Sequence, residues 1–168
     1  MSTLLIDNHI AANFRTGATA LLPSARTLSF ETSRRLEDKQ YDVMKAVFAR
    51  TGGCATEIAA ARQLSRRSTH SPSTLMSWIA TRAIVSFPWR SHTQVPLFQF
   101  CPDDMSPRRE VTDVVRELAD VFDDWELAFW FAQSNSWLEG VAPAEIIGHD
   151  PAAVHAAARA DRYIARGY

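Results

Sequence analysis

The sequence predicts a mainly α-helical protein with one small β-hairpin between two groups of helices. Apolar residues recur at helical spacing along most of the chain, and one stretch rich in β-branched and aromatic residues, 83–100, interrupts them. Apolar residues make up 46% of the 168, an ordinary content for a folded protein. The chain can therefore bury the core of one sizeable domain or of two small ones.

The chain divides into four predicted segments. The first has no sustained apolar period and contains Gly17 and Pro23, so it is expected to be irregular. The segments are an irregular N-terminal arm over residues 1–32, a basic helix-turn-helix-like domain over 33–100, a linker over 101–106 and an acidic helical domain over 107–168.

Charge is distributed unevenly along the chain although the net charge is only −1. Residues 24–100 carry 11 Lys and Arg against 5 Asp and Glu, whereas residues 101–168 carry 6 against 13. This asymmetry favours two surfaces with different partners, the basic one suited to phosphate. The alternative is that the two halves attract each other.

Three helices are predicted in the basic half. The first runs from about Ser33 to the glycines at 52–53, and the second covers residues 55–64. The third begins at Ser71, an N-cap residue, with Pro72 at its first helical position. Its inward face is predicted to carry Leu75, Trp78 and Ile79.

A hairpin is predicted after the third helix, with its turn near residues 90–93 and with Pro88 and Pro96 on sheet edges. Helix, polar turn, helix and hairpin is the order of a winged helix-turn-helix, which would place the third helix in a DNA groove. The stretch PSTLMSWIATRAIVSF also resembles the recognition helix and wing entry of excisionase- and MerR-type modules. The expected DNA contacts are Arg66, Arg67, Ser73, Thr74, Met76, Ser77, Arg82, Arg90 and His92.

The acidic half is predicted to be helical almost throughout. Apolar residues from Val111 to Phe122 follow a strong amphipathic pattern, a second helix contains Trp125, Pro143 opens a short turn, and Asp150 caps the last helix. Two charge stripes are predicted, and they either face each other or present the arginines to a partner. The stripes are Asp113, Glu117, Asp120 and Asp124 on one helix, and His155, Arg159, Arg162 and Arg166 on the other.

The stretch WELAFWFAQSNSWLEG places large aromatic residues around a predicted chain reversal. Asn135 is expected to end the helix in a left-handed conformation, and Gly140 is expected to provide a second reversal. Trp125 and Phe129 are assigned to the core. For Trp130 and Trp137 the sequence leaves two roles open, which are packing in the core and anchoring a partner.

One pattern in the acidic half resembles a known family. It runs W-x4-N-x2-L-x-G-x2-P from Trp130 to Pro143, with two isoleucines behind it and Arg166-Gly167 at the end of the last helix. Over residues 107–168 the chain resembles the Xre/MbcA/ParS toxin-binding domain of antitoxins that pair with RES-domain toxins, which degrade NAD.

The resemblance implies an all-α domain that covers the active site of a toxin and a protein that dimerises and represses its own operon through DNA binding. The basic half departs from the family because it looks winged rather than Cro-like. The toxin-binding residues implied by the pattern, the arginine stripe and the C-terminus are Trp130, Asn135, Trp137, Leu138, Gly140, Pro143, Arg159, Arg162, Arg166 and Tyr168.

No catalytic motif is present, since the sequence lacks GxSxG, GxxxxGK[ST] and HExxH and its five histidines are scattered. Cys54 and Cys101 lack the spacing of a metal site. We therefore expect an antitoxin, not an enzyme, with no cofactor and no metal; the alternatives are a DNA-binding regulator whose acidic domain only dimerises, and an adaptor without a nucleic-acid role.

The expected location is the cytoplasm. The N-terminus does not resemble a signal peptide, and the longest apolar run, residues 127–132, is too short to cross a bilayer. The expected partners are a cognate toxin, operator DNA and a second copy of the chain, and no membrane.

Overall fold

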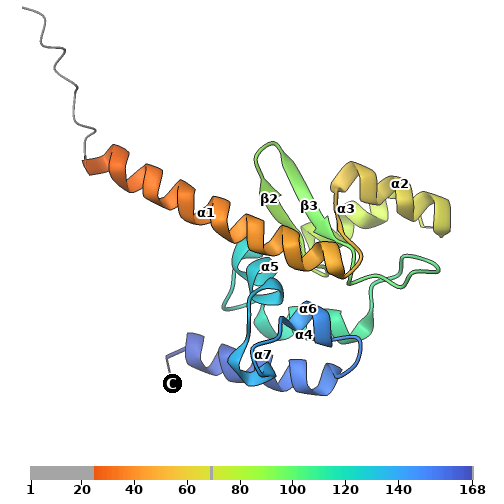
Figure 1. Ribbon diagram of the computed structural model, residues 1–168. Coiled ribbons are helices and arrows are strands. Elements are labelled where there is room, and N and C mark those ends of the chain that lie inside the picture. Colours follow the sequence, from red (N-terminus) through yellow and green to blue (C-terminus); the bar gives the residue numbers. More distant parts are fainter. Residues whose placement is uncertain (1–24, 69, 168) are drawn as a thin grey trace, which may run out of the picture.

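The computed structural model describes residues 25–68 and 70–167 and shows a mostly helical fold with one small antiparallel sheet (Figure 1). The long helix α1 crosses the molecule, with α2, α3 and the sheet at one side and α4 to α7 at the other. The elements are α1 (Ala25–Arg50), β1 (Cys54–Thr56), α2 (Glu57–Arg67), α3 (Pro72–Ala80), β2 (Phe87–Trp89), β3 (His92–Pro96), α4 (Arg109–Leu118), α5 (Asp124–Ala132), the 3-10 helix η1 (Ser136–Leu138), α6 (Pro143–Ile146) and α7 (Pro151–Ala165).

Helix α1 begins earlier than predicted. It starts at Ala25, so the arm expected over residues 1–32 is helical in its last eight residues, and the rest of the arm lies outside the described residues. No glycine or proline follows Pro23 before the helix is established, and alanine, arginine and leucine all favour it. The residues from 31 to 39 are exposed, and this part of α1 extends beyond the rest of the fold (Figure 1).

The predicted hairpin is present, but the sheet has a third strand. Strand β1 pairs with β3, which places β3 in the centre and leaves β2 at an edge. Pro88 lies on this edge strand as expected, whereas the edge assignment of Pro96 is wrong, because Pro96 ends the central strand opposite Cys54. A short strand such as Cys54–Thr56 is too brief to produce a recognisable period-two pattern.

Helices α2 and α3 follow the predicted order, but both ends of α2 differ from the prediction. Residues 55 and 56, predicted to be helical, belong to β1, and α2 starts at Glu57. Thr56 caps α2 by accepting a hydrogen bond from the Ala59 amide, and the helix continues to Arg67, so the polar stretch expected to break it at 65 is partly helical. Arginine favours helices, which explains the extension. The predicted start of α3 is confirmed: Ser71 accepts from the Ser73 amide and Pro72 is the first helical residue.

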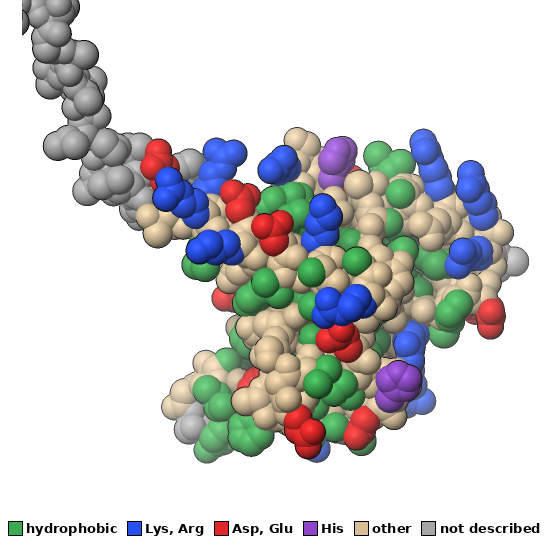
Figure 2. All heavy atoms as spheres, viewed as in Figure 1, with side chains coloured by type: hydrophobic (Ala, Val, Ile, Leu, Met, Phe, Trp, Pro, Cys, Tyr) green, Lys and Arg blue, Asp and Glu red, His purple; other side chains and the backbone are tan. Residues whose placement is uncertain are grey.

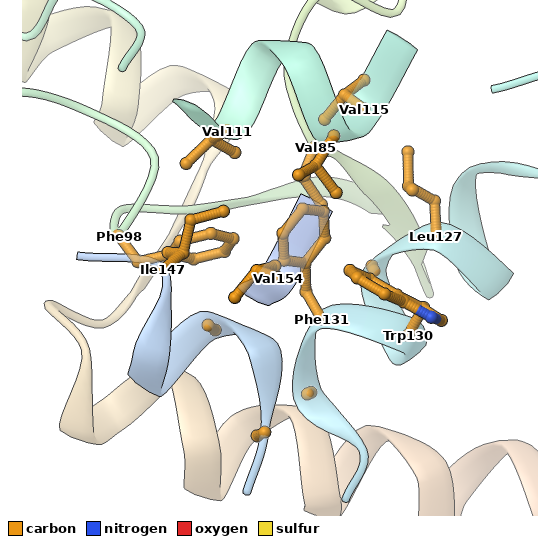
Figure 3. Close-up of a cluster of buried hydrophobic side chains, with 14 of the residues drawn as sticks. Val85, Phe98, Val111, Val115, Leu127, Trp130, Phe131, Ile147 and Val154 are labelled. Carbon is orange, nitrogen blue, oxygen red and sulfur yellow. The ribbon is translucent and has the colours of Figure 1, made fainter. Parts of the chain in front are cut away.

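The larger hydrophobic core contains side chains from both halves of the chain. Figure 3 shows Val85 and Phe98 of the first half among Val111, Phe131 and Val154 of the second. All five are buried. A second cluster, made mainly by α2, α3 and the central strand, fastens the helical pair to the sheet.

The segment expected to be a linker, residues 101–106, is packed against the fold. Met105 is buried in the second cluster, and its amide donates to the Cys101 carbonyl at 2.9 Å. Phe100 forms an isolated bridge with Pro107 across the base of this loop. The division into a basic and an acidic domain stays a prediction, and the shared core shows that the two halves are in close contact.

Helix α4 is shorter than its amphipathic pattern suggests. It ends at Leu118, and Val121 and Phe122, predicted to be helical, lie in the following turn with their side chains still against the core. Asp123 then opens α5 with a reciprocal cap: it accepts from the Glu126 amide at 2.8 Å, and the Glu126 carboxylate accepts from the Asp123 amide at 2.9 Å. The predicted starts of α6 at Pro143 and of α7 after Asp150 are confirmed.

Candidate functional site

The aromatic corner is the chain reversal between α5 and α6, residues 133–142. Asn135 does not end α5 in a left-handed conformation, as predicted, because its φ is −113° and α5 ends at Ala132. It caps η1 instead, its side-chain oxygen accepting a hydrogen bond from the Trp137 amide at 2.9 Å. The left-handed residues are Glu139 and Gly140, with φ of 56° and 83°.

Asp161 of α7 ties the corner to the last helix. Its Oδ2 accepts hydrogen bonds from Trp130 Nε1 at 2.8 Å and from Asn135 Nδ2 at 2.9 Å. Its Oδ1 accepts from Trp137 Nε1 at 3.0 Å. Bonds to an ionised acceptor are stronger than neutral ones, so one carboxylate holds two indoles and one amide in a defined arrangement.

The structure separates the two tryptophans that the sequence left open. Trp130 is 2% exposed and belongs to the larger core, whereas Trp137 is 57% exposed. Trp125 and Phe129 pack against the core, as expected. Among residues 125–140, Trp137 is therefore the one aromatic side chain that is available to a partner. Its hydrogen bond to Asp161 fixes the orientation of the indole.

The other predicted corner residues form its framework. Leu138 and Pro143 are buried, and Gly140 occupies a backbone conformation that a residue with a Cβ atom rarely adopts. Val141 of the corner is an exposed apolar side chain, and Tyr163 and Ile164, which follow Asp161 on α7, are exposed as well. Figure 2 shows hydrophobic side chains gathered over the C-terminal end of α7.

The two predicted charge stripes meet only in part. The acidic stripe does not lie on one helix, because α4 ends at Leu118 and Asp124 begins α5, where it pairs with Arg82. Asp113 pairs with Arg109 and Arg116 of its own helix, and only Glu117 and Asp120 face the arginines of α7.

Arg162 donates to Glu117 at 2.8 Å and to Asp120 at 3.2 Å, and Arg166 also bonds to Asp120. Arg162 and Arg166, expected at the toxin interface, are therefore engaged within the molecule. Arg159 is exposed and makes no hydrogen bond or ion pair within residues 31–68 and 70–167. Tyr168 lies outside the described residues.

These contacts shift the pKa of their members. Loss of solvent acts to raise the pKa of Asp120, but the hydrogen bonds and positive charges of Arg162 and Arg166 outweigh it and hold the pKa below its usual value. The hydrogen bonds that Arg162 donates to Glu117 and Asp120 raise the pKa of the guanidinium. Both shifts favour the charged pair.

A second candidate site is the basic face of α2 and α3. Arg62, Arg66 and Arg67 are exposed on α2, and Figure 2 shows Lys and Arg side chains gathered there. Arg67 also donates to the Pro102 carbonyl at 3.1 Å. Of the predicted contacts on α3, Ser73, Met76 and Ser77 are exposed and Thr74 is half-buried.

Arg82 has a role other than the one predicted. It lies beyond the end of α3 with a φ of 52°, and its guanidinium donates to the carbonyls of Ala119 and Phe122 and to Asp124, each at 2.7 Å. It therefore binds the turn between α4 and α5, which the sequence could not reveal because these residues are about 40 positions away. These three hydrogen bonds engage its guanidinium within the molecule.

The hairpin turn carries the remaining predicted DNA contacts. Arg90 is exposed, with a φ of 55°, and its guanidinium lies 5.5 Å from the centre of the Trp89 ring. His92 is exposed at the start of β3. Both side chains can reach a ligand that approaches the hairpin.

Within the described ranges the chain brings together no group of three or more His, Cys, Asp or Glu side chains that could hold a metal ion. The same residues form no helix that is both long and apolar enough to cross a membrane.

Sequence reasoning missed Asp161. Trp130, Asn135 and Trp137 all carry side-chain N–H donors, which signals that a reversal bringing them together needs an acceptor. Nothing in the pattern indicated that the acceptor would come from α7, 24 residues beyond Trp137.

The chain matches no family model, no curated protein and no solved structure.

Proposed function

We propose that this protein is an antitoxin that binds a partner enzyme and covers its active site through the aromatic corner. The observation that carries the proposal is that Trp137 stands 57% exposed while Asp161 fixes its indole. A large exposed aromatic side chain held in one orientation is typical of an interface anchor, since little conformational entropy is lost on binding. The resemblance of residues 107–168 suggests an enzyme of the RES type, which degrades NAD.

The contacts suggest different roles for some of the residues that the sequence placed at this interface. Trp137 is the anchor, and Val141 and Ile164 are exposed apolar side chains that could extend it. Trp130 and Asn135 act through Asp161 to hold the corner in shape. Arg159 replaces Arg162 and Arg166 as the arginine that can contact an anionic ligand of the partner, because the other two already have carboxylate partners.

Co-expression with the product of the neighbouring open reading frame tests the proposal. The expected result is a stable complex, recovery from growth arrest and an unchanged cellular NAD level. Trp137→Ala is expected to weaken the complex at least about 30-fold, as loss of a central interface aromatic usually does. The control Val43→Ala alters an exposed apolar side chain of α1, outside the corner, and equal effects of both substitutions would contradict the role of the corner.

A specific arrangement supports DNA binding as a second function. The element order α1, β1, α2, α3, β2, β3, with β3 central in the sheet, supports the expected winged helix-turn-helix. In that arrangement α3 would enter the major groove and the hairpin would contact the backbone. The exposed residues on α3 and the hairpin are Ser73, Met76, Ser77, Arg90 and His92, and Arg66 is exposed near the end of α2. This arrangement suits an antitoxin that represses its own operon and equally a stand-alone regulator.

Fluorescence anisotropy with a duplex from upstream of the gene tests this second function. Affinity is expected to fall steeply with salt, and Arg66→Ala is expected to reduce the salt slope by about one unit. Arg109→Ala, which removes an exposed arginine of α4, is the matched control. A duplex affinity that does not change with salt, or no binding at low salt, would contradict DNA binding without affecting the toxin complex.

A further inference from the structure

A groove of about 560 Å³ lies between α2 and α3. Ile58 and Ala61 of α2 and Pro72 and Met76 of α3 form its apolar lining, which we call the floor. The charged residues that line it, which we call the edge, are Arg62, Arg66 and Glu57. The groove lies outside the aromatic corner, and its occupant is not explained by the interface proposed there.

Two large apolar side chains of the groove floor are exposed to solvent. Ile58 is 54% exposed and Met76 is 51% exposed. They come from two different helices and meet at one groove, so a single ligand could cover both. Methionine also adapts its shape to an incoming apolar group, which is common at peptide-binding surfaces.

The edge of the groove carries two positive charges without an internal partner, against the single carboxylate of Glu57. Arg62 and Arg66 are one helical turn apart, and neither takes part in an ion pair or a hydrogen bond within the described part of the chain. Arg50, Arg82 and Arg162, by contrast, each bind a carboxylate of the molecule. Carboxylates spaced four residues apart on a partner helix would match the spacing of Arg62 and Arg66.

We propose that this groove binds an acidic amphipathic helix of a protein partner. The apolar face of that helix covers Ile58 and Met76, and its carboxylates pair with Arg62 and Arg66, which is the helix-in-groove mode of recognition. Phosphates of a DNA backbone satisfy the two arginines but leave the apolar floor in water. The combination of floor and edge therefore favours a protein helix over DNA as the occupant.

The proposed helix and DNA exclude each other, because Arg66, Ser73 and Met76 belong to both surfaces. Only this exclusion rests on the proposed DNA binding. Binding of the helix is measured without DNA, so its failure and the failure of the DNA proposal are separate results.

The test is an NMR titration of the full ¹⁵N-labelled chain with a synthetic amphipathic helix that carries leucines on one face and glutamates on the other. Saturable shifts confined to α2 and α3 are expected, and the same peptide with lysines in place of glutamates is expected not to bind. No saturable binding, equal binding of the lysine peptide, or shifts centred on other elements would overturn the proposal.

Substitutions locate the contacts. Met76→Ser and Arg66→Glu are each expected to weaken binding of the glutamate peptide about tenfold or more. Arg116→Glu, at an exposed position of α4, is the control and is expected to leave it unchanged. Since Met76 and Arg66 are exposed, circular dichroism is expected to show an unchanged fold, and unchanged affinity in both groove variants would overturn the proposal.

Other occupants give other results. Shifts of α2 and α3 that depend on protein concentration without peptide would assign the groove to a second copy of the chain. Saturable shifts there from a peptide of residues 1–24, with no effect of the glutamate peptide, would assign it to the N-terminal segment. Either result would overturn the partner helix.

Discussion

Asp161 fixes the orientation of the Trp137 side chain, because its carboxylate accepts a hydrogen bond from that indole and one each from Trp130 and Asn135. Asp161→Asn replaces one acceptor oxygen by an amide donor and removes the charge. The expected result is a loss of about 2 kcal/mol of stability and a more mobile Trp137. Urea denaturation and tryptophan fluorescence anisotropy measure the two effects.

Asp103→Asn is the matched control for this prediction, because Asp103 is an exposed carboxylate that takes part in no hydrogen bond or ion pair among residues 31–68 and 70–167. It is expected to change neither quantity. A variant Asp161→Asn with wild-type stability and an unchanged anisotropy would contradict the proposed positioning of Trp137.

Asp120 makes the stability of the molecule depend on pH in the acidic range. Its pKa is lowered in the folded chain, so its contribution is complete above the unfolded pKa of about 3.9 and is lost as pH falls through the folded value. Asp120→Asn is expected to lower the melting temperature at neutral pH, and the difference from wild type is expected to shrink below about pH 4. A difference that stays constant down to acid denaturation would contradict this role.

At the scale of elements, Arg82 connects the end of α3 to the turn between α4 and α5. Its guanidinium donates to two backbone carbonyls and one carboxylate in a geometry that lysine cannot copy. Arg82→Ala is expected to cost about 1.5 kcal/mol, with Arg82→Lys restoring less than half. The midpoint of urea denaturation measures the change. Full restoration of stability by lysine would contradict a role for the planar guanidinium group.

The helix starts marked by a cap followed by proline were predicted correctly, whereas the start of α1 and the ends of α2 and α4 were not. Ser71 before Pro72 and Asp150 before Pro151 are local signals, since a side chain caps backbone amides only two or three residues away. The end of α4 at Leu118 was not predicted, because the apolar pattern continues to Phe122 although the backbone turns. Apolar spacing indicates which side chains reach the core, but it does not indicate whether the backbone between them is helical.

At the scale of the whole molecule, one core joins the halves that charge and composition separated. The rings of Phe98 and Phe131 are tilted by 47° with their centres 5.2 Å apart, and the rings of Phe87 and Trp125 meet edge to face at 5.6 Å. The expected result is a single cooperative unfolding transition in calorimetry, with equal calorimetric and van 't Hoff enthalpies. Two separated transitions would show that residues 33–100 and 107–168 unfold independently.

The sequence by itself determined the helical class, the hairpin, the caps and the core positions Trp125 and Phe129, because these depend on neighbours within a few residues. Only the tertiary structure decided which tryptophan is exposed, which arginines are already engaged and that Asp161 closes the corner. Contacts such as Trp137 with Asp161 or Arg82 with Phe122 join residues 24 and 40 positions apart. No local pattern encodes such pairs, since they exist only once α3, α5 and α7 have packed on one core.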